Sequence, residues 1–408
     1  MRTGDRVVCR YGGAELEGTF ITTRDDEAVI KLDSGYNIGI GPSSIIEIRR
    51  QELPAPVVSA VEQNPDLPEL AILSTGGTIA SRIDYRTGAV TSQFDADDIL
   101  RAIPRLGEMA RFNAHQVASI LSENMTTSLW IDLARGIYDE IRNGAMGVIV
   151  THGTDTMSFS ASAISFMLDT PVPVVFVGSQ RSADRPSSDN VMNALCSASA
   201  ALSDLGEVAV VMHASTSDDR CAVHRATKVR KMHTSRRDAF ASIGMPPLGY
   251  VDYPSLAVRL GDDAVRRRSG EAVLHDAVEE KVGLLSFYPG MPADLLSQFE
   301  GYRGLVLAGT GLGHVSTASI GGLRDLIGGG CHVVMTSQCL HGRVCDRVYD
   351  TGRDLLALGV IEGEDMLPEV ALVKLMWVLG RHDDPGEVAR LVRTNLRGEI
   401  RRCSYNGF

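Results

Sequence analysis

Short runs of alternating apolar and polar residues fill the first fifty positions of the chain. Turn-forming residues such as Gly12, Gly13 and Gly35 separate these runs, and this pattern is typical of short strands joined by tight turns. The predicted strands are 6–10, 15–22, 28–32, 36–40 and 44–48. Five strands in so short a segment favour a small SH3-like β-barrel domain over residues 1–50.

The pattern changes after residue 50. Four prolines between residues 51 and 68 cannot sustain a helix or an inner strand, so this segment is predicted to be a linker. From residue 69, apolar runs alternate with segments of helical periodicity such as 128–143. The predicted strands are 70–74, 147–151, 172–177 and 208–213. This alternation predicts a parallel sheet with helices on both faces, forming a first α/β domain over residues 69–260.

A polar, charge-rich stretch around residues 259–280 interrupts the alternation. Apolar runs then return at 282–287, 304–308 and 332–336, again separated by longer segments. The predicted fold class is therefore α/β, with a second and smaller α/β domain over residues 280–408.

Composition narrows the class of protein. Of 408 residues, 44% are hydrophobic and 22% are charged, which is typical of a globular protein. No apolar run is long enough for a membrane helix, and the first residues lack the apolar centre of a signal peptide, so we expect a cytoplasmic protein without membrane contact. The net charge of −11 has the wrong sign for binding nucleic acid alone, so an RNA partner would require a local basic patch or another subunit.

The seven cysteines are scattered and contain no CxxC pair, which fits a reducing compartment. The densest group is Cys331, His332, Cys339, His341 and Cys345. Its spacing matches no common zinc pattern, so no metal site is predicted.

The loop STGGTIAS at 74–81 follows the first strand of the α/β region. Its two glycines would suit a phosphate-binding loop, but the lysine of a Walker loop and the third glycine of a dinucleotide loop are both absent. The glycine-rich segment GTGLGH at 309–314 also departs from the dinucleotide pattern, and a turn is predicted there. The remaining interpretation of STGGTIAS is that one of its hydroxyls takes part in chemistry. A threonine hydroxyl needs a nearby base to act as a nucleophile.

A second polar motif, THGTDTM at 151–157, follows the strand predicted at 147–151. One interpretation is structural, because Thr154 or Asp155 could cap a helix over 158–168. The other is chemical, because parallel strands bring the ends of both motifs to one edge of the sheet.

The pair TGGTIA at 75–80 and HGTDT at 152–156 resembles the two signature motifs of the bacterial-type asparaginase and glutaminase family. The resemblance extends from about residue 69 to the C-terminus and implies an asparaginase-like two-domain core. It also implies that Thr78 is the nucleophile and that Thr154 and Asp155 form a triad with a distant lysine.

The segment 225–235 resembles the lysine segment of that family, with Phe240 at the expected distance, and this alignment selects Lys231 over Lys228. Another interpretation is that the basic residues here form a solvated face or contact an RNA backbone. These residues are Arg225, Lys228, Arg230, Lys231, Arg236 and Arg237.

The remaining site residues also come from the resemblance. Tyr85 corresponds to the activating tyrosine, although an exposed tyrosine in a variable loop is the alternative. Ser122 corresponds to the serine that holds the substrate α-carboxylate, and Asp155 is expected to contact substrate as well. Glu123 stands where many members have glutamine, and its carboxylate would suit the substrate ammonium group.

The resemblance implies attack of Thr78 on the side-chain amide of the substrate, with an acyl-threonine intermediate. Lys231 beside Asp155 would act as base through Thr154, or Tyr85 would act at Thr78; the sequence leaves both open. No metal or organic cofactor is required in this chain.

The extra N-terminal domain, together with the segments 366–369 and 374–380, resembles the D subunits of archaeal glutamyl-tRNA(Gln) amidotransferases. That resemblance implies a glutaminase that supplies ammonia to a partner, the E subunit, which binds Glu-tRNA(Gln) and uses ATP and Mg2+. It further implies a homodimeric core within a heterotetramer. The alternatives are a stand-alone asparaginase or glutaminase and a non-catalytic protein of the same fold.

Overall fold

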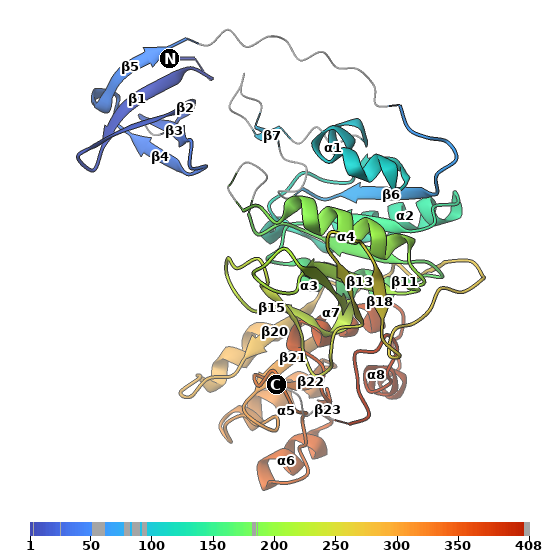
Figure 1. Cartoon of the computed structure of the whole chain (residues 1–408). Coiled ribbons are helices and arrows are strands. Elements are labelled where there is room, and N and C mark those ends of the chain that lie inside the picture. Colours follow the sequence, from blue (N-terminus) through green and yellow to red (C-terminus); the bar gives the residue numbers. More distant parts are fainter. Residues whose placement is uncertain are drawn as a thin grey trace.

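The computed structural model describes residues 1–50 except 3 and 25, residues 62–76, 82–83 and 90–91, and residues 96–403 except 182–184 and 186. Figure 1 shows a small N-terminal sheet, a large α/β body and a second α/β unit near the C-terminus.

The N-terminal unit is a five-stranded antiparallel sheet in the order β4-β3-β2-β1-β5. All five strands predicted in this region are confirmed, and alternate residues such as Val7 and Cys9 point into a small core. Within the predicted linker, residues 62–68 contain no helix or strand, and residues 51–61 lie outside the described part of the chain. The strands are β1 (Arg6–Tyr11), β2 (Ala14–Arg24), β3 (Glu27–Leu32), β4 (Asn37–Ile40) and β5 (Ile45–Arg49), with a 3-10 turn, η1 (Pro42–Ser44), before β5.

An eight-stranded sheet forms the centre of the first α/β domain, in the order β18-β17-β14-β13-β12-β10-β6-β9. The strands predicted at 70–74, 147–151, 172–177 and 208–213 are confirmed as neighbouring parallel strands. The sheet is mixed, because β14, β17 and β18 extend it in antiparallel fashion. The strands are β6 (Glu69–Ser74), β9 (Arg111–Gln116), β10 (Val148–Thr151), β12 (Val174–Val177), β13 (Val208–His213), β14 (Arg220–Arg225), β17 (Gly249–Asp252) and β18 (Val258–Leu260).

Helices cover both faces of this sheet, as predicted. In β6, Ala71 and Leu73 pack into the core that contains α2 and α3, whereas Leu70 and Ile72 pack into the core that contains α1 and α4. This alternation follows from the two-residue period of a strand and explains why the run is wholly apolar. The helices are α1 (Ala96–Ala102), α2 (Thr127–Arg142), α3 (Met157–Met167) and α4 (Asn190–Leu202).

The second α/β unit has a four-stranded parallel sheet in the order β20-β21-β22-β23. Helix α7 contacts both α3 and this sheet, so one continuous apolar core joins the two units. The predicted strands at 282–287, 304–308 and 332–336 are confirmed. The elements are β20 (Val282–Ser286), η5 (Ala293–Phe299), β21 (Gly304–Gly309), α5 (Ser319–Gly328), β22 (His332–Ser337), α6 (Asp350–Leu358), β23 (Ile361–Glu362), α7 (Pro368–Leu379) and α8 (Pro385–Val392).

Short elements connect these layers. They comprise the strand pairs β7 (Arg82–Ile83) with β8 (Val90–Thr91), β11 (Leu168–Asp169) with β19 (Val273–Leu274), and β15 (Val229–Lys231) with β16 (Phe240–Ser242). They also include the 3-10 turns η2 (Pro104–Glu108), η3 (Ser122–Asn124) and η4 (Ala226–Lys228).

The glycine-rich segment 309–314 is a turn, as predicted. Thr310 and Gly313 donate backbone hydrogen bonds to the carbonyls of His314 and Thr310, each at 2.9 Å. Among the described residues, no helix is long and apolar enough to cross a bilayer.

Candidate active site

The candidate site lies where β6 and β10 end. These two strands are parallel neighbours, and Ser74 is in register with Thr151. The loop after β6 is held against the loop after β10, because both the backbone N–H and the hydroxyl of Thr75 donate to the carbonyl of Thr151, at 3.1 and 3.3 Å. The two motifs singled out in the sequence therefore meet at the carboxyl edge of the sheet, where α/β enzymes place their chemistry.

Gly76 fixes the path of the chain as it leaves β6. Its φ of +115° favours glycine, and a Cβ at this position would lie 2.4 Å from the carbonyl oxygen of Ile120. The amide of Ile120 in turn donates to the carbonyl of Thr75 at 3.1 Å. The loop is thus packed backbone to backbone against the segment that leads to Ser122. Thr78 and Tyr85 lie outside the described residues, so their roles stay predictions.

Thr154, Asp155 and Lys231 are brought together across 77 residues of sequence. The Lys231 amino group donates to Thr154 Oγ1 at 2.9 Å and to the Asp155 carboxylate at 2.6 Å. The Lys231 side chain is 13% exposed, whereas that of Asp155 is 69% exposed. One amino group is therefore held between a hydroxyl and a carboxylate at an open edge of the fold.

The local fold explains why Lys231 points there. Lys231 ends β15 and pairs directly with Phe240 of β16. Phe240 is buried in the core that contains α3, so the β15–β16 hairpin anchors the lysine beside the first turn of that helix. Phe240, which helped to identify the lysine segment in the sequence, is therefore also the strand partner of Lys231.

Lys228 has a different environment. It is 1% exposed, and its amino group donates to the Asp365 carboxylate and to the Asp365 carbonyl, each at 2.8 Å. Burial lowers the pKa of Lys228, and Asp365 opposes that effect. The sequence-based choice of Lys231 over Lys228 therefore agrees with the position of both side chains.

The basic residues of this segment do not form one solvated face, because Arg225 and Lys228 are buried, whereas the Arg236 side chain is 54% exposed. Contact with an RNA backbone stays a prediction. Four arginines of this segment pair with carboxylates, which come from neighbouring loops and, for Arg230, from helix α7. The pairs are Arg225 with Glu207 at 2.7 Å, Arg230 with Glu369 at 3.6 Å, Arg236 with Asp238 at 2.6 Å, and Arg237 with Asp218 at 2.5 Å.

Ser122 lies against the loop after β10. It is 5% exposed, and its carbonyl accepts a hydrogen bond from Thr156 Oγ1 at 2.7 Å. A Cβ on Gly153 would lie 2.7 Å from Ser122 Cβ and 3.0 Å from its Oγ, so glycine permits this close approach. Glu123 follows in η3 with an exposed side chain. The predicted substrate-binding pair therefore adjoins the loop that carries Thr154 and Asp155.

The capping interpretation of the second motif is wrong. The N-cap of α3 is Thr156, and no side chain caps the helix. The Asp155 carboxylate instead accepts a hydrogen bond from Lys231, so it interacts with the lysine and not with the helix backbone.

Sequence reasoning missed His152, which precedes Gly153 and is 1% exposed. Burial lowers its pKa to about 4, although the nearby Gly153 carbonyl opposes this shift. Nδ1 lies 2.7 Å from that carbonyl, and Nε2 has no hydrogen-bond partner among the described residues. The imidazole is therefore neutral near pH 7, and it packs in the interior below the loop that carries Thr154 and Asp155. A histidine directly after a buried strand was the available signal.

A buried polar chain behind the site was also missed. Asp189 is fully buried and accepts from the amides of Gln180 and Arg181 and from the side chain of Asn193. Asn193 Oδ1 lies 2.6 Å from Nδ1 of His213. This chain fixes the segment that follows β12. An asparagine within an apolar helix was its only sequence signal.

In the part of the chain that the structure describes, no group of three or more His, Cys, Asp or Glu residues is placed to hold a metal ion. All seven cysteines are free thiols. Cys331 is buried, which raises its pKa to about 11, whereas Cys339 is exposed. The cysteines and histidines of 331–345 therefore do not converge on one point.

Three families match consecutive parts of the chain. Residues 69–262 match the family described as Asparaginase, N-terminal, and residues 281–392 match the Glutaminase/Asparaginase C-terminal domain. Residues 1–50 match the GatD N-terminal domain. Among solved structures, the chain is similar to the thermostable L-asparaginase from Thermococcus kodakarensis, with a TM-score of 0.73 and 30% identity. That likeness covers 82% of this chain and 100% of the other.

Three relatives that match over nearly the full length are named as the D subunit of glutamyl-tRNA(Gln) amidotransferase. The protein of that name from Methanosarcina barkeri is 52% identical, with 99% of each chain covered. Its counterpart from Archaeoglobus fulgidus is 54% identical, covering 97% of this chain and 95% of the relative. The counterpart from Halobacterium salinarum is 55% identical, covering 94% of each. The chain therefore belongs to the family of glutamyl-tRNA(Gln) amidotransferase D subunits, whose core has the asparaginase fold.

Proposed function

We propose that this chain is the glutamine-hydrolysing subunit of a tRNA-dependent amidotransferase. The observation that carries the proposal is the position of the Lys231 amino group, which donates to both Thr154 Oγ1 and the Asp155 carboxylate at the carboxyl edge of the sheet. A hydroxyl linked to a lysine is a route for moving a proton to and from a nucleophile. The match to amidotransferase D subunits over almost the whole chain supports the same function.

In the proposed reaction, the hydroxyl oxygen of Thr78 attacks the side-chain amide carbon of glutamine. Its proton passes to the base and then to the leaving nitrogen, which departs as ammonia. Water hydrolyses the resulting acyl-threonine to glutamate and restores the hydroxyl. Ser122, Glu123 and Asp155 hold the α-carboxylate and α-ammonium groups of the substrate. Tyr85 and Lys231 are the two candidates for the first base.

The partner is proposed to be an amidotransferase E subunit that binds Glu-tRNA(Gln). That partner uses ATP and Mg2+ to activate the glutamyl group, and ammonia from this chain converts it to Gln-tRNA(Gln). The net charge of −11 suits a chain that leaves most RNA contacts to its partner. We further propose a homodimeric core within a heterotetramer, located in the cytoplasm.

The test is ammonia release from glutamine and from asparagine, with and without the E subunit and Glu-tRNA(Gln). We expect glutamine to be preferred and the rate to rise when the partner and the charged tRNA are present. The variant Thr78→Val should lose ammonia release and keep the melting temperature of the unchanged chain. Full glutaminase activity of the isolated chain would refute the dependence on the partner, and activity in Thr78→Val would refute the nucleophile.

A stand-alone asparaginase is the second candidate, and the fold shared with the Thermococcus kodakarensis enzyme favours it. That function predicts rapid hydrolysis of asparagine by the isolated chain and no response to the E subunit. The same measurement therefore separates the two functions.

A further inference from the structure

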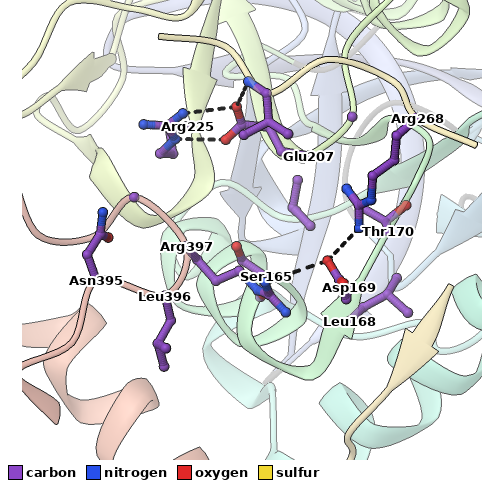
Figure 2. A pocket seen from close by; sticks show the side chains of 14 residues that line it. Ser165, Leu168, Asp169, Thr170, Glu207, Arg225, Arg268, Asn395, Leu396 and Arg397 are labelled. Atoms are coloured by element: carbon purple, nitrogen blue, oxygen red, sulfur yellow. Dashed lines mark hydrogen bonds and ion pairs between the residues drawn. The ribbon is translucent and has the colours of Figure 1, made fainter. Parts of the chain in front are cut away.

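A cavity of about 300 Å³ lies at the edge of the main sheet opposite the candidate active site. Gly206 and Glu207 line it just before β13 begins, whereas the catalytic motifs follow the ends of β6 and β10. The segment after α8 closes its other side, as Figure 2 shows for Asn395, Leu396 and Arg397. The cavity is therefore separate from the proposed glutaminase site.

Five of the fourteen residues that line the cavity are charged. At the buried end, Arg225 binds Glu207 through two hydrogen bonds of 2.7 and 3.0 Å. At the open end, Asp169 accepts from Arg268 at 2.7 Å and lies 3.6 Å from Arg397 (Figure 2). Three arginines face two carboxylates, so one positive charge in the lining has no matching negative charge.

Donor groups in the lining are also left over. In the described part of the chain, Nη1 of Arg225 has only the sulfur of Met245 as an acceptor, at 4.0 Å. The side-chain oxygen of Asn395 accepts a long hydrogen bond of 3.4 Å from Ile400, and because Asn395 is exposed, its amide nitrogen is open to solvent and can donate to a ligand. Guanidinium and amide donors of this kind match the oxygens of a carboxylate.

The wall formed by residues 395–398 is held rigidly. The hydroxyl of Thr227 donates to the Arg397 carbonyl at 3.0 Å, and Arg397 donates to the Ser165 carbonyl at 2.8 Å. Gly398 has a φ of +76°, and a Cβ there would lie 2.6 Å from the Arg225 side chain. The cavity is therefore shaped before any ligand binds, which lowers the entropic cost of binding.

From this geometry we propose that the cavity binds a small carboxylate anion of amino-acid size. The unbalanced charge favours a negatively charged ligand, and the available donors supply its hydrogen bonds. A volume at the lower end of the range for small-molecule sites excludes nucleotides and other large anions. The exposed Asp169 and Arg268 side chains, at 44% and 40%, mark the entrance.

The cavity is connected to the glutaminase site along two short stretches of chain. Ser165 lies in α3, which begins directly after the loop that carries Asp155, and Arg225 lies at the end of β14, shortly before Lys231. A bound carboxylate would thus contact α3, which begins two residues after Asp155, and the end of β14, which lies six residues before Lys231. We expect occupancy to change the rate of ammonia release, and this expectation rests on the proposed glutaminase function, whereas binding itself does not.

Calorimetric titration of the full chain tests the site, with sodium glutamate, sodium succinate and sodium phosphate at constant ionic strength. The variant Asn395→Asp keeps the acceptor for Ile400 and places a carboxylate in the lining, and Arg268→Gln removes a positive charge. Arg266→Gln is the matched control, because Arg266 lies 3.9 Å from Asp204 and outside the cavity lining.

We expect glutamate or succinate to bind, with at least about tenfold weaker binding in Asn395→Asp and Arg268→Gln and no change in Arg266→Gln. Melting curves check that each variant is folded. Glutamate bound at the glutaminase site would be insensitive to these substitutions, so only the sensitive component counts. The proposal fails if no carboxylate shows such a component, or if phosphate binds this site more tightly than both carboxylates.

Discussion

Lys228 and Lys231 are near neighbours in sequence and belong to two very different regions of the molecule. Lys228 pairs with Asp365 at the junction of the two α/β units, where the side chains are 1% and 7% exposed. Lys231 pairs with Asp155 at the edge of the sheet, where the carboxylate is 69% exposed. The same residue type therefore serves in a closed ion pair and in an open one.

The difference follows from what surrounds each pair. The Asp365 carboxylate also accepts from the backbone of Arg401 at 2.9 Å, so its capacity is used within the protein. The Lys231 amino group reaches a hydroxyl as well as a carboxylate, and solvent reaches the Asp155 side chain. In a closed pair each partner is needed by the fold, because its loss leaves the other charge buried, whereas an open pair next to a hydroxyl is free to take part in chemistry.

The largest expected effect is on activity and comes from Lys231→Met. Loss of the amino group would remove the proton route through Thr154, and such routes contribute about 10²- to 10⁴-fold to a rate. We expect the kcat for glutamine to fall by about that factor, measured with the E subunit and charged tRNA. Stability should change little, because an exposed ion pair contributes at most about 1 kcal/mol. A large loss of stability with unchanged kcat would reverse the assignment of the two lysines.

Lys228→Met should have the opposite profile. Removing one partner of a buried pair leaves Asp365 with only Arg343, 3.9 Å away, as a cation, and costs up to about 3–5 kcal/mol, measured by denaturant unfolding. The folded fraction should keep its kcat. In the double variant Lys228→Met with Asp365→Leu, no unpaired charge remains, so part of the loss should be recovered. Equal stability of Lys228→Met and the unchanged chain would show that the junction does not depend on this pair.

The parallel strands could be predicted from the sequence. The sequence also indicated the position of Lys231, but not the buried ion pair of Lys228. The runs at 70–74 and 208–213 are almost wholly apolar because both faces of the sheet are covered. Strand β9 was missed because RFNAHQ is the outermost strand of the sheet and is largely polar. Strand β14 was missed because RCAVHR begins and ends with arginine, although five of its six residues are buried.

The sequence pointed to Lys231 through its resemblance to the family's lysine segment, which includes Phe240. The two residues are close in sequence and pair in the β15–β16 hairpin. The burial of Lys228 was not predictable, because its partner Asp365 lies 137 residues away and a lysine in a basic run resembles a solvated one. The position of Lys231 could therefore be predicted from local spacing, whereas the burial of Lys228 depends on a tertiary contact that the sequence does not reveal.

Asp346 extends the comparison to a buried carboxylate whose oxygens have no hydrogen-bond partner among the described residues. Burial raises its pKa to about 7, and the nearby charge of Glu362 adds to the shift. An unfolded aspartate has a pKa near 4, so the folded state binds more protons between about pH 4 and pH 7. Stability from this group is therefore present at low pH and is lost as the pH rises through 7.

Asp346→Asn should remove that dependence. Relative to the unchanged chain, the variant should gain up to about 4 kcal/mol between pH 4 and pH 7, measured by denaturant unfolding at several pH values. Asp354→Asn on the exposed side of α6 is the control and should show no such gain. Parallel pH profiles for Asp346→Asn and the unchanged chain would contradict the raised pKa.

Gly153→Ala tests how closely the open site is packed beneath its exposed carboxylate. The added methyl would lie 2.7 Å from Ser122 Cβ, so either Ser122 or the loop before Thr154 must move. We expect a loss of about 1–3 kcal/mol in stability and a higher KM for glutamine, because Ser122 is the proposed ligand of the α-carboxylate. Gly321→Ala in α5 meets no atom within 4 Å and should instead gain up to about 1 kcal/mol. An unchanged KM in Gly153→Ala would separate Ser122 from substrate binding.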